Sequence, residues 1–313
     1  MSFTATTVKE LREKTGAGMM DCKKALEETK GDFEKAIDFL RTKGLAAAQK
    51  KQSRVAAEGL VINNISGNAA SMVEVNCETD FVAKNADFIA FVNDLSKLIT
   101  ANKPACVTTE EGPNNLVSMK LPHGRTVAET VSDLTLKIGE KISVRRFNRI
   151  ELQGNGLFGT YVHNGKIAVL VELGTESANA NGKTEVQELA KDIAMHVAAA
   201  APTFLQGSEM DEGFKVREAE IYATQLREQG KKEEMIAGIV KGKLSKLAQD
   251  VCLLEQKFVK NPDIAVQQLV ADVSKQVGEK LTVRRFLKIN LGEGIEKRQD
   301  NLADEVAKMT KKA

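Results

Sequence analysis

The sequence predicts an α+β protein: an N-terminal three-helix module, then two related subdomains, each an antiparallel sheet backed by helices. Three observations point to this class. Residues 126–147 align without a gap with residues 265–286 and share ten identical positions, among them GEK and VRRF. Two pairs of segments with alternating apolar residues flank short turns, as in β-hairpins. Apolar residues at helical spacing follow each pair, so each sheet has a helix to cover it.

Residues 1–53 are expected to form the N-terminal module and its linker. Apolar side chains recur there at helical spacing, and glycines interrupt the pattern at Gly16, Gly18, Gly31 and Gly44. The pattern predicts three short helices over 4–14, 19–29 and 32–43. An Ala-, Lys- and Gln-rich stretch from 46 to 57 then predicts a linker to the next domain.

The two core subdomains are expected over 54–150 and 151–290. In the first, segments 60–65 and 71–77 flank a turn at 66–68. In the second, segments 156–163 and 166–173 flank Asn164 and Gly165, a pair that accepts the positive φ angles of a type I′ turn. A helix follows each hairpin, with its apolar face at Phe88, Phe91, Val92, Leu95, Leu98 and Ile99 in the first copy and Val186, Leu189, Ile193 and Val197 in the second.

Residues 208–258 are an insertion that only the second subdomain carries. Its apolar residues form two helical seams with Gly230 between them, which predicts an antiparallel helical hairpin and a protein-binding arm. Residues 291–313 are expected to form a C-terminal module that contains a helix.

Composition excludes several classes of function. The 45 Lys and Arg residues nearly cancel the 43 Asp and Glu residues, so the chain lacks the basic excess of a nucleic-acid binder. No apolar run is long enough to cross a membrane. The four cysteines form no C-x-x-C pair and no apolar signal segment precedes them, so we expect a cytoplasmic protein.

Two glycine motifs suggest nucleotide binding, but their context argues against it. Gly154, Gly156 and Gly159 spell G-x-G-x-x-G, yet a predicted strand follows them where a dinucleotide fold needs a helix. The G-K-T triplet at 182–184 lacks the required glycine five residues before it, where Ser177 stands. The chain is therefore expected to hold no nucleotide or other cofactor.

Metal binding and covalent catalysis have no local signature either. His123, His163 and His196 are far apart, and none lies at ligand spacing from a cysteine. No G-x-S-x-G or comparable nucleophile motif occurs. We therefore expect no metal site and no enzyme.

Four separated motifs resemble the elongation factor Ts family, in the family's order and over nearly the whole chain. They are KELREKTGAGMMDCKKAL at 9–26, EVNCETDFVAKN at 74–85, HVAAAAP at 196–202 and GEGIEK at 292–297. The resemblance implies a guanine-nucleotide exchange factor of translation that binds elongation factor Tu carrying GDP. Nucleotide exchange of this kind changes no covalent bond. The resemblance therefore implies an exchange factor that is not an enzyme.

The resemblance places the exchange wedge at Thr79, Asp80, Phe81 and Val82. In the family this phenylalanine inserts between two helices of the partner's GTPase domain, while the aspartate disturbs the Mg²⁺ site. The residues alone leave two interpretations of Phe81: a core side chain, or an exposed anchor in a strand-to-helix connection.

Further contacts are expected in both halves. Met19, Met20 and Asp21 should bind the GTPase domain, unless both methionines are buried as the module folds. His163 flanks a predicted hairpin tip and, with His196, is a candidate contact with a second domain of elongation factor Tu. The helical hairpin could join two heterodimers into a larger assembly.

Two other functions stay open at this point. The three-helix start resembles ubiquitin-associated (UBA-like) domains, which would suit a pure adaptor. The glycine motif leaves an oxidoreductase as the other alternative.

Overall fold

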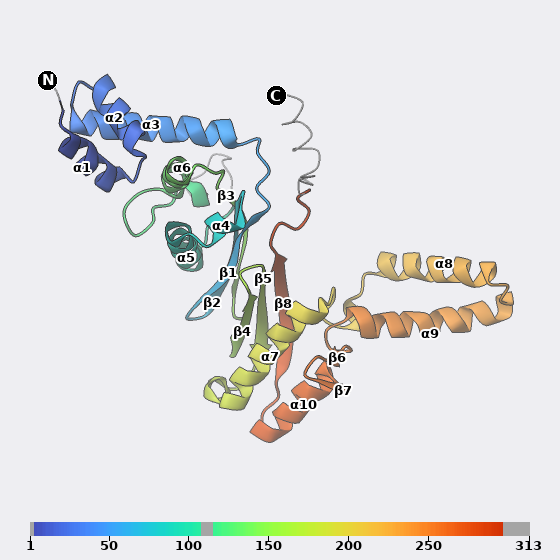
Figure 1. Ribbon diagram of the computed structural model, residues 1–313. Coiled ribbons are helices and arrows are strands. Elements are labelled where there is room, and N and C mark those ends of the chain that lie inside the picture. The colour runs from blue at the N-terminus through green and yellow to red at the C-terminus, as the bar shows by residue number, and fades with distance from the viewer. Residues whose placement is uncertain (1–2, 108–114, 297–313) are drawn as a thin grey trace. The chain divides into compact units, whose positions relative to one another are not determined.

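The computed structural model describes residues 3–107 and 115–296, which form two compact units (Figure 1). Unit 1 comprises the described residues of Met1–Ile62, Val73–Asn148 and Asn290–Ala313. Unit 2 comprises Asn63–Met72 and Arg149–Ile289. Helices combine with antiparallel sheets, so the predicted α+β class is confirmed. Across these described ranges, no helix is long and apolar enough to cross a membrane. Most of the expected C-terminal module, 297–313, lies outside the described residues.

Three helices form the N-terminal module: α1 Ala5–Thr15, α2 Met19–Glu28 and α3 Phe33–Lys51. Thr4 begins α1 by accepting a hydrogen bond from the N–H of Thr7, and Gly16 ends it in the left-handed conformation. The helices enclose a small apolar core that includes the fully buried Leu11 and Leu26. The expected three-helix module is thus present.

α3 is longer than the sequence predicted, and the expected end near Lys43 is wrong. The helix continues through Gly44 to Lys51 and so occupies half of the expected linker. A Cβ atom at Gly44 would lie 3.4 Å from the carbonyl oxygen of Ser132 on α6 (Val127–Ile138). This is an ordinary contact distance, so the approach of α6 does not itself require glycine, but packing of α3 on α6 offsets the low helix propensity of Gly44.

The first sheet has the strand order β1-β2-β3. β1 and β2 form the first expected hairpin, and helix α5 supplies the expected apolar face, with Phe88, Leu95 and Ile99 fully buried. The elements are β1 Glu58–Ser66, β2 Ala69–Cys77, α4 Asp80–Ala83, α5 Ala86–Asn102, the 3-10 turn Leu116–Ser118, α6 and β3 Ser143–Glu151.

The second sheet has the strand order β4-β5-β8. β4 and β5 pair antiparallel from Gly156 opposite Gly174 to His163 opposite Ile167. Asn164 and Gly165 between them have φ angles of 51° and 67°, as the type I′ turn requires. The elements are β4 Gly156–His163, β5 Ile167–Gly174, the 3-10 turn Ala178–Gly182, α7 Thr184–Ala200, α10 Val266–Val277 and β8 Thr282–Asn290.

The glycines of the G-x-G-x-x-G motif serve packing. A Cβ atom at Gly159 would lie 2.1 Å from the carbonyl oxygen of Ala190, because α7 crosses β4 at this point. A Cβ atom at Gly156 would lie 2.5 Å from the carbonyl oxygen of Leu173 on β5. The motif therefore lies in and before a hairpin strand, and the dinucleotide-binding interpretation is wrong.

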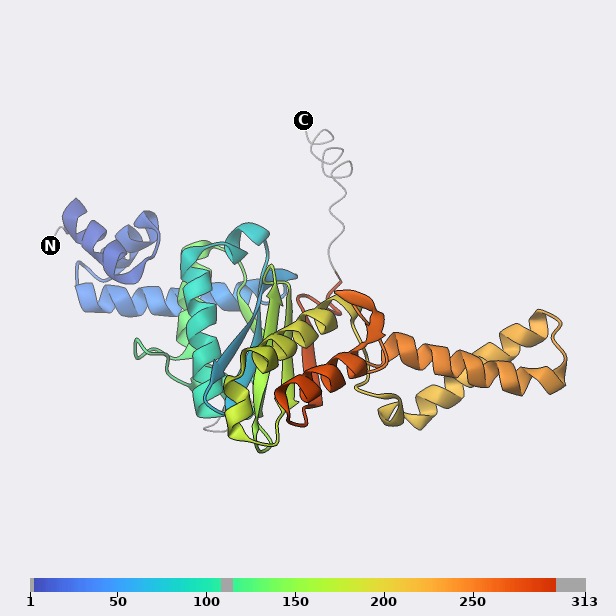
Figure 2. The same cartoon turned by 90° about the horizontal axis from the view of Figure 1, so that it is seen from below.

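The insertion in unit 2 is the expected helical hairpin, formed by α8 Glu212–Glu228 and α9 Glu233–Val251 (Figure 2). Leu226 and Ile236 are buried, whereas Val216, Ile221 and Met235 are exposed. A short strand pair that the sequence did not predict follows, β6 Lys257–Phe258 and β7 Asn261–Ala265, and the 3-10 turn Gly207–Glu209 precedes α8.

The internal repeat reappears as one ion-pair arrangement in each unit. Glu74 on β2 is fully buried and binds Arg145 at 2.9 Å and Arg146 at 2.6 Å. Glu172 on β5 is fully buried and binds the repeat-equivalent Arg284 at 3.2 Å and Arg285 at 2.7 Å. The shared VRRF sequence thus holds a buried carboxylate in both copies.

Candidate partner-binding site

A single turn of helix, α4, follows strand β2 in unit 1. Thr79 caps it by accepting a hydrogen bond from the N–H of Val82 at 3.4 Å. Val82 and Ala83 point into the core, which leaves Phe81 80% exposed. The interpretation of Phe81 as a core residue is therefore wrong, and the side chain is free to contact another protein.

Asp80 is the first residue of α4, where the helix dipole favours a carboxylate. Its Oδ2 atom lies 2.8 Å from Nζ of Lys84, and both side chains are at least half exposed. An exposed pair of this kind contributes little to stability. The ion pair with Lys84 is therefore a weak constraint on this carboxylate.

Cys77 lies directly before this turn but does not supply a nucleophile. Its thiol donates a hydrogen bond to the carbonyl oxygen of Thr79 at 3.1 Å. Burial raises the pKa of Cys77 to about 12, so the group stays protonated at neutral pH. Within residues 3–107 and 115–296, no group of three His, Cys, Asp or Glu side chains is placed to hold a metal.

A second exposed apolar group lies at the start of α2. Met20 is 73% exposed and Met19 is 43% exposed. Asp21 forms an ion pair with Lys43 of α3, and the next residue, Cys22, is fully buried. The alternative in which both methionines are buried is therefore wrong, and this turn presents flexible apolar side chains to solvent.

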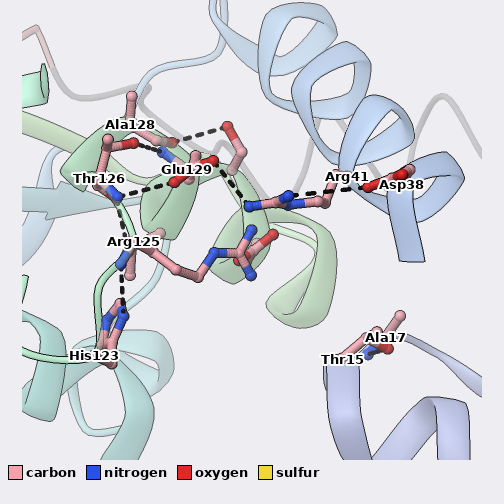
Figure 3. A network of polar contacts seen from close by, with 12 residues as sticks. Thr15, Ala17, Asp38, Arg41, His123, Arg125, Thr126, Ala128 and Glu129 are labelled. Atoms are coloured by element: carbon pink, nitrogen blue, oxygen red, sulfur yellow. Dashed lines mark hydrogen bonds and ion pairs between the residues drawn. The ribbon is translucent and has the colours of Figure 1, made fainter. Parts of the chain in front are cut away.

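The N-terminal module packs against α6 within unit 1. Figure 3 shows Arg41 of α3 beside Glu129 of α6, with a distance of 3.0 Å between Nη2 and Oε1. Glu129 also closes a capping box with Thr126. Exposed ion pairs are weak, so we assign most of the stabilisation to apolar packing, to which Leu136 of α6 contributes by packing on the module's core.

A cavity of about 220 Å³ lies between the module and α6, with Leu40, Arg125 and Leu136 in its lining. Arg125 forms an ion pair there with Asp133. Burial raises the pKa of Asp133 despite this guanidinium. The other cations of the lining, Lys14 and Arg41, are also paired with carboxylates, so the cavity gives no reason to propose a ligand.

His163 lies at the tip of the β4–β5 hairpin in unit 2 and is exposed. Its Nδ1 atom is 3.1 Å from the hydroxyl of Tyr161, and the two rings stack with centroids 6.1 Å apart. Neighbouring Val162 is 38% exposed. The tip therefore offers an oriented imidazole beside an apolar side chain.

His196, the other histidine proposed from the sequence, is fully buried in α7. Its Nε2 atom lies 2.9 Å from Oε1 of Gln256, and its Nδ1 atom accepts the N–H of Val259 at 3.3 Å. Burial lowers its pKa and so favours the neutral imidazole. The structure thus corrects the expected surface contact: the buried imidazole positions the turn that exposes Val259.

The family model described as "Elongation factor TS" matches residues 78–293. The chain belongs to the elongation factor Ts family. It is 49% identical over 313 residues to elongation factor Ts of Clostridioides difficile (strain 630), with 99% of each chain covered. It is also 46% identical over 310 residues to elongation factor Ts of Clostridium perfringens (strain SM101 / Type A), with 98% of this chain and 99% of the relative covered.

Membership of the elongation factor Ts family confirms the resemblance that the four motifs indicated and gives the chain a role in translation elongation. The matched region begins at Glu78, beside the Thr79–Val82 turn, and includes both copies of the GEK and VRRF repeat. Sequence reasoning assigned the turn but overlooked Glu140 of the first GEK, whose side chain bonds to it. The repeat itself was the signal that could have drawn attention to this residue.

Proposed function

We propose that this chain is the guanine-nucleotide exchange factor for elongation factor Tu. The observation that carries the proposal is Phe81, an 80% exposed aromatic side chain on a capped turn whose neighbours are fixed in the core. Bound GDP depends on Mg²⁺ and on the backbone around its phosphates. An aromatic wedge with Asp80 beside it would disturb both.

The mechanism is linkage between two binding sites. A factor that binds nucleotide-free elongation factor Tu more tightly than the loaded form must lower nucleotide affinity by the same ratio. GTP then refills the site and releases the factor. No step needs a nucleophile, a cofactor or a metal held by this chain.

The contacts proposed for the GTPase domain all lie in unit 1. Thr79, Asp80, Phe81 and Val82 form the wedge turn, and Met19, Met20 and Asp21 form the second contact. His163 in unit 2 is the proposed contact with another domain of elongation factor Tu. The exposed side chains of α8 and α9 are the proposed surface through which two such complexes would associate.

Release of a fluorescent GDP analogue from purified elongation factor Tu tests the proposal directly. The chain should accelerate release in a saturable way, and excess GTP should dissociate the complex. Binding without any acceleration would instead support an adaptor, and an absence of binding would refute both functions.

Replacing Met19 and Met20 together by alanine should weaken binding of elongation factor Tu roughly tenfold, because two exposed apolar contacts are removed. A titration of GDP release against factor concentration measures the change as a higher half-saturating concentration. Leu45→Ala, at a 56% exposed position of the same module, is the matched control and should leave the titration unchanged. Equal effects of the two variants would contradict a specific methionine contact.

His163→Ala should also weaken binding, roughly fivefold to tenfold, but should preserve the release rate at saturating factor. Two linked contacts raise each other's effective concentration, so losing one lowers affinity without altering the wedge. The same titration distinguishes the outcomes. A lower plateau with an unchanged midpoint would place His163 in the exchange step and contradict this assignment.

A further inference from the structure

The underside of the wedge turn is held by a residue from another part of unit 1. Glu140 follows Gly139, which ends α6 in the left-handed conformation with φ of 85°. The Glu140 carboxylate accepts hydrogen bonds from the N–H of Glu78 at 3.1 Å, the N–H of Thr79 at 2.9 Å and the hydroxyl of Thr79 at 2.7 Å. All three donors belong to the residues that precede Asp80 and Phe81.

The attachment is reciprocal. The Glu78 side chain accepts the N–H of Lys141 at 2.6 Å. Nζ of Lys141 then donates to the carbonyl oxygens of Gln52 at 2.6 Å and Arg54 at 2.9 Å, where the N-terminal module ends. The GEK turn at 139–141 therefore joins the wedge turn to the chain segment that leads from the methionine-bearing module.

Unit 2 contains the equivalent anchor under a different turn. Glu279 of the second GEK accepts the N–H of Ser177 at 3.2 Å and its hydroxyl at 2.7 Å. The two positions after Ser177 are Ala178 and Asn179, where unit 1 has Asp80 and Phe81. The hydrogen bonds from a GEK glutamate to the preceding turn are thus common to both copies. Of these two turns, only the one bound by Glu140 carries an exposed aromatic side chain.

We infer that Glu140 is a positioning residue of the exchange site, which holds the base of the wedge turn so that Phe81 is rigid when it meets elongation factor Tu. The inference rests on the proposed function. A helix of one turn has little stability of its own, so its geometry depends on external bonds. If the turn changed its conformation on contact, Phe81 would move instead of displacing the partner's helices. A turn that is already held in its bound conformation also loses little conformational entropy on binding.

The variant Glu140→Gln tests the inference in the GDP-release assay. It keeps the shape of the side chain but removes the charge from three hydrogen bonds, two of them to backbone N–H groups. We expect the maximal release rate to fall about tenfold while the half-saturating concentration changes less than about twofold. Glu279→Gln removes the same anchor from unit 2 and should leave both parameters at their wild-type values.

Two further measurements separate positioning from general destabilisation. Glu140→Gln should cause no additional loss of rate when Phe81 is already alanine, because it acts through that side chain. Hydrogen exchange at the amides of residues 78–82, measured on the chain alone, should become faster in Glu140→Gln and stay unchanged in Glu279→Gln. Thermal unfolding should shift equally in the two variants.

Three outcomes would overturn the inference. These are a wild-type release rate in Glu140→Gln, an equal loss of rate in Glu279→Gln, and an additive effect in the Phe81→Ala background. Each of them leaves the proposed function intact, provided that the wild-type chain accelerates release. If the wild-type chain does not accelerate GDP release, the proposed function fails and the positioning role fails with it.

Discussion

Phe81→Ala should slow the maximal rate of GDP release from elongation factor Tu about 30-fold. The side chain is 80% exposed in the free chain, so its removal costs the fold little. An aromatic anchor buried in a partner typically contributes about 2 kcal/mol or more, and this free energy converts to the expected change in rate. Stopped-flow release of a fluorescent GDP analogue at saturating factor measures it.

Two control variants make the result specific. Phe81→Leu keeps part of the apolar volume and should retain an intermediate rate. Asn179→Ala changes the equivalent position in the second copy, where no aromatic residue stands, and should behave like the wild type. If Phe81→Ala released GDP as fast as the wild type, the wedge would have to be assigned to another residue.

The fold was largely predictable from the sequence because its elements carry local patterns. The Asn164–Gly165 pair specified its turn, since few residues accept two successive positive φ angles. The apolar faces of α5 and α7 followed helical spacing, and both are buried as expected. The C-terminal half of α3 was missed because Gly44 locally favours a break, and only packing on α6 shows why the helix continues.

The functional surface was less predictable because exposure and long-range bonds leave little local trace. The TDFV motif located the turn, but only the structure separates buried Val82 from exposed Phe81. His196 lay in an apolar, alanine-rich stretch that gave no indication of Gln256, its partner 60 residues away. Glu140 bonds to Thr79 across 61 positions, so no local pattern could assign its role.

The buried carboxylate of Glu74 is a polar feature of unit 1 whose loss should strongly destabilise the chain. It accepts hydrogen bonds from Arg145, Arg146 and the N–H of Gly292, the last at 2.8 Å. Burial alone would raise its pKa, but the Gly292 N–H and the two guanidinium groups outweigh burial and hold the pKa of Glu74 below its ordinary value. The folded chain therefore favours the ionised form.

The lowered pKa of Glu74 determines how the free energy of unfolding changes with pH. A carboxyl whose pKa is lower in the folded state stabilises the fold above its unfolded pKa, and this contribution is lost as the pH falls. For Glu74 the loss begins near the ordinary value of 4.5 and is completed below the lower pKa of the folded state. Despite burial, the pKa of Glu172 in unit 2 is also held below its ordinary value by the Gln153 N–H and the guanidinium groups of Arg285 and Arg284, so unit 2 should likewise weaken as the pH falls below 4.5.

Glu74→Ala should therefore lower the free energy of unfolding at pH 7 by about 3 kcal/mol, because it leaves Arg145, Arg146 and the Gly292 N–H without their shared acceptor. The loss should shrink as the pH falls from 4.5 through the lower pKa of the folded state, because the wild-type chain then loses the same contribution. Urea unfolding at several pH values measures both effects.

Glu172→Ala should show a loss of similar size, whereas Glu188→Ala on the exposed face of α7 should change stability by less than about 0.5 kcal/mol. A Glu74→Ala loss that matched Glu188→Ala, or that stayed constant down to low pH, would show that the two arginines find equivalent acceptors without this carboxylate.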